Sequence, residues 1–366
     1  MEIEFVLPFE LWIEILSWLP VKTLMRFSCV SKSWKSLIYQ DRDFKKLHLD
    51  RSPKNNNQVI LTLQKPLFSG RTFFPFPVRR LLQDQEPSSS SIIDDIPFEE
   101  EDEDEEDNYH DTIGSCNGLV CLYGINDHGL WFRLWNPATR FRFHKSPPLD
   151  AVIGSTLHFA FGYDHSRDTY KVVVLCSIYY GRRLGGQLLT MVHCIGDSCW
   201  RQISRDPGLP VELDHTNGLF VGGCVNWVAL DDLQRRIVSF DIHDETYQSL
   251  SLPKGTSELP YVEIQVLGNC LCLFHDDNRT HFVGWKMTEY GVPESWTRML
   301  SISYQHFQCN DVILRHRWLV CLCGDGNILM LAKDEGGLVI IFNLSDNSVK
   351  YIKFPQKDFG WVLRIT

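Results

Sequence analysis

The feature that most constrains the fold is a loose repeat that runs from Thr112 onward. Each unit has an apolar strand, a polar hairpin tip and a second apolar strand. The tips recur 46 to 58 residues apart, near Asp127, Gly181, Asp231, Asp277 and Glu335. This is close to the roughly 50-residue period of one class of propeller blade. An all-β sandwich is the alternative, but it does not explain why the same phase returns at this spacing. The repeat therefore predicts a β-propeller of about six blades, with a degenerate blade formed by the strands around 58–78.

The stretch Leu7–Ile38 predicts three short helices instead. Leu19-Pro20 marks a helix boundary because a proline restricts the residue before it, and Pro8 suits the first position of a helix. The inward side of the second and third helices is expected to comprise Leu24, Phe27, Val30, Trp34, Leu37 and Ile38. Helices this short cannot bury all their apolar side chains among themselves, so part of this surface is expected to meet a partner.

The order of residues in this stretch resembles an F-box. The resemblance rests on Leu7-Pro8, Leu11, Ile15-Leu16, Leu19-Pro20, Leu24 and Cys29-Val30-Ser31-Lys32-Ser33-Trp34. It implies docking on a Skp-type adaptor and, through the adaptor, on a cullin ubiquitin ligase. A helical bundle whose apolar residues are all internal is the alternative, and it does not explain so long a match in fixed order. The adaptor-facing surface and the core behind it are expected to comprise Leu7, Pro8, Leu11, Ile15, Leu16, Leu19, Pro20, Val21, Leu24, Val30 and Trp34.

The repeating region resembles the plant F-box-associated domain. The likeness rests on Gly114-Ser-Cys-Asn-Gly118, Leu134-Trp-Asn-Pro-Ala-Thr139, Phe161-Gly-Tyr-Asp164, Asp168-Thr-Tyr-Lys-Val172 and Gly222-Gly-Cys-Val-Asn-Trp227. The C-terminal third matches only in outline. In that family the domain is taken to hold the protein destined for ubiquitination. The resemblance thus implies the substrate-recognition subunit of a Skp–cullin–F-box ubiquitin ligase, with a protein substrate that the sequence does not name.

The predicted domain map places a three-helix F-box at 1–48, a linker at 49–57 and the all-β domain at 58–366. A disordered acidic insertion is expected at 84–111, because a block of like charges with few apolar groups cannot offset its own ordering entropy. The alternative is a docking segment for a basic partner. The run Glu99–Asp107 is wholly acidic and accounts for most of the formal net charge of −10, so the rest is close to neutral. This argues against a general nucleic-acid binder, which would carry a basic surface.

Motifs for catalysis or for a metal site are sparse. The sequence contains no Gly-x-Ser-x-Gly, phosphate-binding loop or His-Glu-x-x-His, so no catalytic residue and no cofactor are expected. His275 and His281 share one hairpin, where a metal is conceivable but a solvated turn is favoured. The runner-up function is a propeller enzyme, hydrolase or oxidoreductase, tethered to an adaptor.

The cysteines and the lack of a long apolar run indicate where the protein resides. None of the twelve cysteines forms a Cys-x-x-Cys pair, so small buried hydrophobic residues in a reducing compartment, cytoplasm or nucleus, are expected rather than zinc ligands. No run of about 18 apolar residues predicts a membrane span.

Substrate contacts are expected at the hairpin tips, because loops of equal phase emerge on one face of a propeller and irregular tips on a regular scaffold carry binding residues. The candidates are Tyr179, Tyr180, Arg182, Arg183, Asp231, Asp232, His275, Asp276 and Asp277. The alternative is that these are merely solvated hairpin ends. The turns after Asn136, Asp241 and Asn343 repeat an Asn/Asp-x-x-Thr/Asp pattern and are expected to be structural parts of the opposite face.

Overall fold

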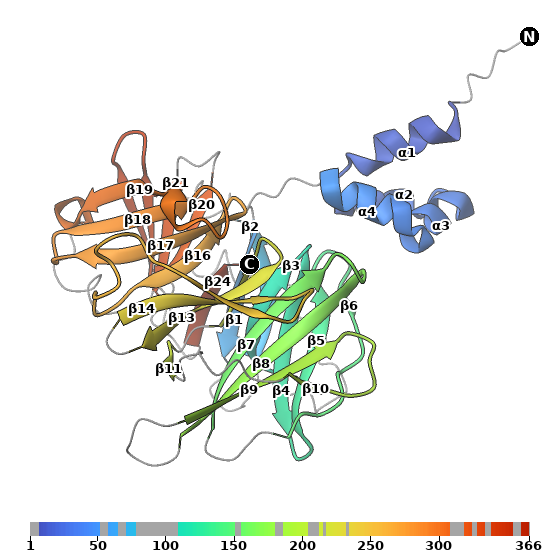
Figure 1. The fold of residues 1–366 in the computed structure, drawn as a ribbon. Coiled ribbons are helices and arrows are strands. Elements are labelled where there is room, and N and C mark those ends of the chain that lie inside the picture. The colour runs from blue at the N-terminus through green and yellow to red at the C-terminus, as the bar shows by residue number, and fades with distance from the viewer. Residues whose placement is uncertain are drawn as a thin grey trace, which may run out of the picture.

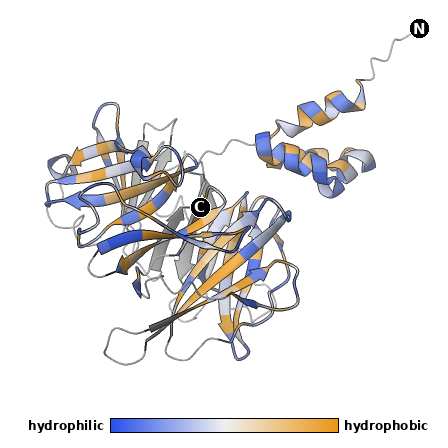
Figure 2. Ribbon diagram, in the orientation of Figure 1, coloured by the Kyte–Doolittle hydropathy of each residue, from blue (hydrophilic) through white to orange (hydrophobic). Residues whose placement is uncertain are grey.

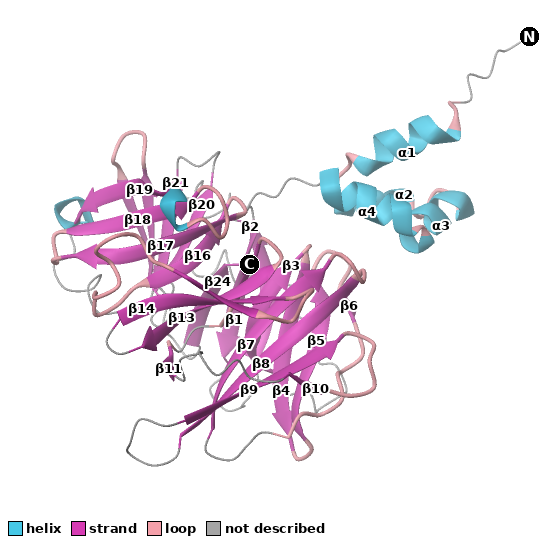
Figure 3. Cartoon of the chain, viewed as in Figure 1, coloured by secondary structure: helices cyan, strands magenta, loops and turns pink. Residues whose placement is uncertain are grey.

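The structure is a computed structural model. It describes residues 7–51, 58–64, 71–77, 109–150, 155–179, 186–203, 212–214, 217–231, 234–307, 318–323, 328–333, 338–353 and 360–365. Helices occupy the N-terminal part and strands follow (Figure 3), apart from two short 3₁₀ turns at Pro293–Ser295 and Tyr304–Phe307. In the described part, no helix combines the length and the apolar character that a membrane span requires.

The N-terminal unit has four helices, not three. They are α1 Phe9–Ser17, α2 Val21–Phe27, α3 Lys32–Gln40 and α4 Arg42–Arg51. The sequence prediction missed α4, whose start is fixed by the side chain of Asp41, which accepts a hydrogen bond from the Phe44 backbone N–H at 2.8 Å. Phe44 then enters the core of the unit. Helix α4 continues to Arg51, so the helical part extends past the predicted limit at residue 48.

The ends of these helices also differ in detail from the prediction. Pro8 and Pro20 occupy N-cap positions, one residue earlier than the first helical position expected for Pro8. Ser31 caps α3 by accepting a hydrogen bond from the Trp34 N–H. Val30, predicted to face inward, is 68% exposed because it lies in the turn before α3 and not on the helix. The core is formed by Leu16, Leu24, Leu37, Ile38 and Phe44.

Within the described residues the strands form six sheets. Five of the sheets are formed by strands that follow one another in the chain. One contains β3 Tyr109–Cys116, β4 Leu119–Asn126, β5 Gly129–Asn136 and β6 Phe141–Arg142, and the next contains β7 Ser155–Asp164, β8 Thr169–Tyr179, β9 Gly186–Cys194 and β10 Arg201–Ile203. The third contains β11 Glu212–Leu213, β12 Leu219–Val221, β13 Cys224–Asp231, β14 Gln234–Asp241 and β15 Tyr247–Leu250. The fourth contains β16 Glu263–Leu267, β17 Cys270–Asp277, β18 His281–Met287 and β19 Trp296–Ser303. The fifth contains β20 Trp318–Cys323, β21 Ile328–Lys333, β22 Leu338–Asn343 and β23 Val349–Lys353.

The remaining sheet joins the two ends of the strand region. It contains β1 Gln58–Gln64, β2 Arg71–Pro77 and β24 Gly360–Ile365, in the order β2-β1-β24. Strand β24 pairs antiparallel with β1, from Gln64 opposite Gly360 to Val59 opposite Ile365. In Figure 1 the blue strand β1 accordingly lies beside the dark red strand β24. Because the last strand completes the first sheet, this sheet closes the arrangement.

The sheets follow one another as the blades of a propeller do. One strand of each sheet lies next to a strand of the following sheet: β3 with β7, β7 with β12, β12 with β16, β16 with β20 and β20 with β24. Hydrophobic residues, orange in Figure 2, run along the strands. The structure therefore confirms the predicted class, a small all-α unit followed by an all-β domain consistent with a β-propeller. The blade count of about six stays a prediction.

The hairpin tips have the predicted common phase, since each joins the second and third strand of its sheet. They follow β4, β8, β13, β17 and β21. The predicted insertion extends too far, however. Strand β3 begins at Tyr109 and pairs with β4, so its first residues belong to a sheet and not to the segment 84–111.

The turns after Asn136, Asp241 and Asn343 are the structural elements that the sequence indicated. Each of these side chains accepts a hydrogen bond from the backbone N–H two residues later, at Ala138, His243 and Ser345. The residue four positions on has a positive φ in all three turns: Arg140, Glu245 and Asn347. A side chain that caps its own turn stabilises this reversal of the chain.

Close packing between sheets leaves no room for a side chain at Gly162 of β7. A Cβ atom there would lie 2.3 Å from Cδ1 of Ile242 and 2.5 Å from Cδ2 of Phe220, both in or next to the following sheet. Gly114 of β3 has nothing within 4 Å of the corresponding position.

We therefore expect Gly162→Ala to lower the free energy of unfolding by about 1–3 kcal/mol, the usual cost of overpacking, and Gly114→Ala to be nearly neutral. Chemical denaturation of the two variants beside the parent measures both effects. Equal stability of the two variants would contradict the packing of these sheets.

Candidate functional site

Helix α1 presents an exposed apolar face. Leu11 and Ile15 are each 46% exposed and Trp18, directly after the helix, is 64% exposed. Their spacing of four and three residues puts them on one side of the helix. Leu16, on another side, is fully buried in the core of the unit. Helix α1 thus separates a side that packs into the core from a side whose apolar side chains are largely exposed.

The predicted adaptor-facing set divides accordingly. The exposed members are Leu7, Pro8, Leu11, Ile15, Pro20, Val21 and Val30. Leu16 and Leu24 are buried, and Leu19 and Trp34 are half-buried and pack against the same core. Sequence reasoning missed Phe9, Trp18 and Tyr39, which are large, apolar and exposed. The spacing of Trp18 from Leu11 and Ile15 was the available signal.

The tip residues predicted to hold a substrate are described only in part. Tyr179 ends β8, while Tyr180, Arg182, Arg183 and Asp232 lie outside the described residues. Asp231 forms an ion pair with Arg236 at 2.7 Å. Asp276 accepts a hydrogen bond from the Arg279 N–H within its own hairpin. The carboxylates of Asp231 and Asp276 therefore have partners close by in the same hairpins.

The two histidines of the fourth hairpin do not converge on a common point. His275 Nε2 accepts a hydrogen bond from the indole of Trp285 at 3.2 Å, so its Nδ1 carries the proton and donates to the Asp276 carbonyl. His281 contacts Thr280 Oγ1. No group of three or more possible ligands for a metal ion occurs among the residues that the structure describes.

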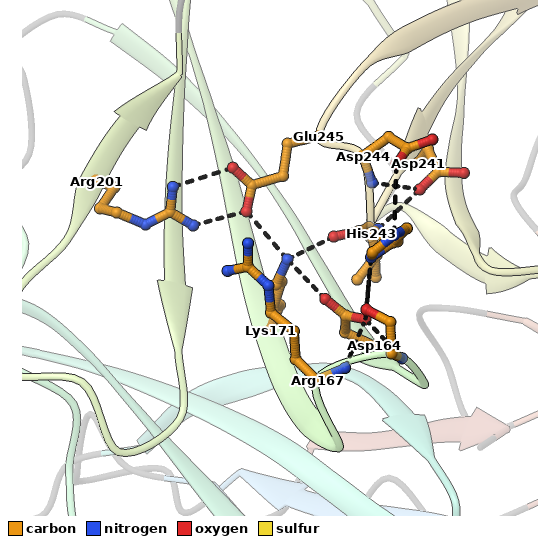
Figure 4. Close-up of polar contacts among 10 residues, drawn as sticks. Asp164, Arg167, Lys171, Arg201, Asp241, His243, Asp244 and Glu245 are labelled. Atoms are coloured by element: carbon orange, nitrogen blue, oxygen red, sulfur yellow. Dashed lines mark hydrogen bonds and ion pairs between the residues drawn. The ribbon is translucent and has the colours of Figure 1, made fainter.

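A buried ion-pair cluster joins the β7–β10 sheet to the β11–β15 sheet (Figure 4). Lys171 Nζ lies 3.0 Å from both Asp164 Oδ2 and Glu245 Oε1, and it donates to the Ile242 carbonyl at 2.6 Å. The side chains of Asp164 and Lys171 are fully buried. Arg201 donates two hydrogen bonds to Glu245, at 2.6 and 3.0 Å. Sequence reasoning found Asp164 and Lys171 only as parts of a family motif and gave them no role.

The pKa values of both carboxyl groups follow from this cluster. Burial alone would raise the pKa of Asp164, but hydrogen bonds from Ser166 and Lys171 outweigh it and hold the pKa well below its usual range. Burial likewise acts to raise the pKa of Glu245, and the hydrogen bonds from Arg201 and Lys171 lower it overall. Both groups therefore stay charged, which a buried lysine requires of its partners.

Next to this cluster, Ser166 and His243 come together as the nucleophile and base of a hydrolase would. Ser166 Oγ lies 2.5 Å from His243 Nδ1, and His243 Nε2 lies 3.5 Å from Asp244 Oδ1. Ser166 Oγ also donates to Asp164 Oδ1 at 2.7 Å, however. Its single proton is thus directed to the buried carboxylate, so His243 Nδ1 acts as the donor to Ser166 and not as a base. The contacts tie together two turns of neighbouring sheets.

Comparison with known protein families gives a match for the helical unit and another for the strand region. An F-box domain model matches residues 5–46, and a model described as an F-box associated beta propeller domain matches residues 76–363, which is most of the chain. The chain belongs to the F-box proteins with an F-box-associated β-propeller domain. The predicted family is thereby confirmed.

Relatives of this F-box protein occur in Arabidopsis thaliana. An F-box/kelch-repeat protein is 26% identical over 94% of this chain and 90% of its own length. A putative F-box protein is 30% identical over 80% of this chain and 61% of its own length. The F-box protein CPR1 is 27% identical over 81% of this chain and 73% of its own length.

We predict that Lys171→Met lowers the free energy of unfolding by about 3–5 kcal/mol, because it leaves the buried Asp164 carboxylate without its lysine counter-charge. Lys254→Met, at an exposed lysine, is the matched control and is expected to be neutral. Chemical denaturation at pH 7 measures both.

A comparison of the parent with Lys171→Met at several pH values also tests the lowered pKa of Asp164. A carboxyl group whose pKa is lowered in the folded state contributes stability above its unfolded pKa and loses it as the pH falls. In the variant the buried Asp164 carboxyl group, which has lost its lysine partner, takes up a proton instead. The stability difference between the parent and Lys171→Met should therefore narrow on acidification, and a difference that stays constant from pH 7 to pH 4 would contradict the charged cluster.

Proposed function

We propose that this F-box protein is the substrate-recognition subunit of a Skp–cullin–F-box ubiquitin ligase. The helical unit binds a Skp-type adaptor and, through it, a cullin, while the β-propeller domain holds a protein substrate for ubiquitination. In this role the chain is a receptor and performs no catalytic step itself.

The observation that carries the proposal is the exposed apolar face of α1. Leu11, Ile15 and Trp18 leave apolar surface in contact with water although the core of the unit is already formed by other residues. Contiguous apolar surface of this kind is typical of a protein–protein interaction site. It lies within the residues that match the F-box domain, and F-box proteins are the curated relatives of this chain.

The propeller supports the second half of the proposal as a scaffold. Its hairpin tips share one phase, so one face of the domain presents several irregular loops at once, which suits the binding of a protein surface. We propose that Tyr179, Tyr180, Arg182 and Arg183 supply the principal contacts, since Tyr and Arg are the types enriched among interface anchors. Asp231, Asp232, His275, Asp276 and Asp277 are proposed as neighbouring contacts.

Among the described residues, no observation favours the alternative of a propeller enzyme tethered to an adaptor. Ser166 and His243 are arranged as parts of turns, as their hydrogen bonds show. Nine cysteines of the described residues carry free thiols, which suits a reducing compartment, and we propose the cytoplasm or the nucleus.

The adaptor contact is tested with the double variant Leu11→Ala, Ile15→Ala. We expect it to bind a recombinant Skp-type adaptor about thirtyfold or more weakly than the parent, because central apolar anchors commonly contribute about 2 kcal/mol or more. Since both side chains are exposed, the unfolding temperature should not change. Leu16→Ala is unsuitable because Leu16 belongs to the core.

Phe141→Ala is the matched control, because Phe141 is an exposed apolar residue of the propeller domain. It should bind the adaptor as the parent does. Undiminished binding by the double variant in isothermal titration calorimetry would refute the proposed adaptor surface.

The substrate face is tested with Tyr179→Ala, Tyr180→Ala, Arg182→Glu, Arg183→Glu in one chain. Adaptor binding should be retained while proteins captured from cells with the proteasome blocked are lost, as measured by affinity purification and mass spectrometry. If capture persists in this variant but is lost when the turns after Asn136 and Asp241 are changed, the substrate binds the opposite face.

A further inference from the structure

Arg51, the last residue of α4, fastens this helix to α1. Its guanidinium forms an ion pair with Glu14 at 2.8 Å and donates to Ser17 Oγ at 2.5 Å. The hydrogen bond from Arg51 lowers the pKa of Glu14. The ring of His48, one turn earlier on α4, lies 2.9 Å from the Leu19 carbonyl just beyond α1. The end of α4 and the end of α1 are therefore joined at several points.

The same guanidinium lies over the ring of Trp18, with Cζ 5.1 Å from the ring centroid. Trp18 Nε1 also donates to Glu14 Oε1 at 3.5 Å. Arg51, Glu14 and Trp18 thus form one chain of contacts at the edge of the exposed face of α1. One face of the indole is covered by Arg51, yet Trp18 is 64% exposed, the most exposed aromatic residue that the structure records in the helical unit.

Two physical effects make this arrangement suited to binding. A planar guanidinium stacks on an indole and at the same time donates to a carboxylate, which an ammonium group does less well. A side chain held in one orientation before binding avoids the entropy cost of being ordered during binding. Tryptophan held in this way offers a large, flat, apolar surface, and tryptophan is among the residue types most enriched at interface anchors.

We propose that Trp18 is an anchor for the Skp-type adaptor and that Arg51 is the residue that positions it. The inference rests on the proposed function and extends it, since the adaptor-binding unit then includes α4 up to Arg51, beyond residue 46 where the match to the F-box domain ends. Arg51 acts through Trp18 in this scheme. The partner surface must supply an apolar groove that takes the free face of the indole next to the side chains of Leu11 and Ile15.

The test is a double-mutant cycle on the full chain, with a recombinant Skp-type adaptor of Arabidopsis thaliana as the probe and isothermal titration calorimetry as the measurement. Trp18→Ala should weaken binding about thirtyfold. Arg51→Met should weaken it by about twofold to tenfold, the usual effect of freeing one side chain at an interface. The double variant should bind no more weakly than Trp18→Ala alone, because Arg51 has no role once the ring is absent.

Two further variants separate positioning from folding. Arg51→Lys keeps a charge that reaches Glu14 but loses the planar stack, so it should weaken binding as Arg51→Met does while the unfolding temperature stays that of the parent. Arg42→Met removes an exposed arginine at the other end of α4 and should bind as the parent does.

The outcomes distinguish this inference from the function on which it rests. If Trp18→Ala binds as the parent does while Leu11→Ala, Ile15→Ala binds weakly, the anchor is wrong and the adaptor surface stands. If the effects of Trp18→Ala and Arg51→Met multiply, Arg51 does not act through Trp18 and the positioning role is wrong. If the parent chain itself fails to bind the adaptor, both the inference and the proposed function are refuted.

Discussion

The pairing of β24 with β1 is the constraint on which the β domain depends. An edge strand exposes a row of unpaired backbone groups, and β1 would be such a strand without β24. Here the last strand hydrogen-bonds to the first one, so residues some 300 positions apart in sequence complete one sheet. Every other sheet consists of neighbouring strands, and its hairpins form locally. The long-range pairing therefore decides whether these local units become one domain.

Within this closed arrangement, polar contacts also hold neighbouring sheets together. Lys171, Asp164 and Glu245 bring opposite charges together where water is excluded, and Gly162 allows the close approach of apolar side chains near by. A buried lysine is tolerated only when its partners remain charged, and the lowered pKa values of the two carboxyl groups show that they do.

Most of the architecture was predictable from the sequence because its signals are local. The phase of the hairpin tips and the caps at Asn136, Asp241 and Asn343 are both set within short segments. Helix α4 was missed because its apolar content is low and its start depends on a single Asp cap. Val30 was predicted to face inward on the third helix, but it lies in the turn before α3. A helical period cannot show at which residue a helix begins.

The residues that sequence reasoning missed depend on contacts between distant segments. Trp18 was not singled out in the sequence, and only its position beside Arg51 shows that it is held in place while exposed. Lys171 is separated from Glu245 by more than seventy residues, so no spacing rule connects them. Exposure and long-range pairing are properties of the folded chain. They decide which apolar side chain is core and which is available to a partner.

The central claim is that the adaptor binds the exposed face of α1 and leaves the propeller domain free for a substrate. Hydrogen–deuterium exchange of the full chain, with and without a saturating Skp-type adaptor, tests this most directly. The account predicts slower exchange in peptides from α1 through α4 and unchanged exchange in the sheets from β3 to β19. Protection of the hairpin tips with unchanged exchange in the helices would contradict it.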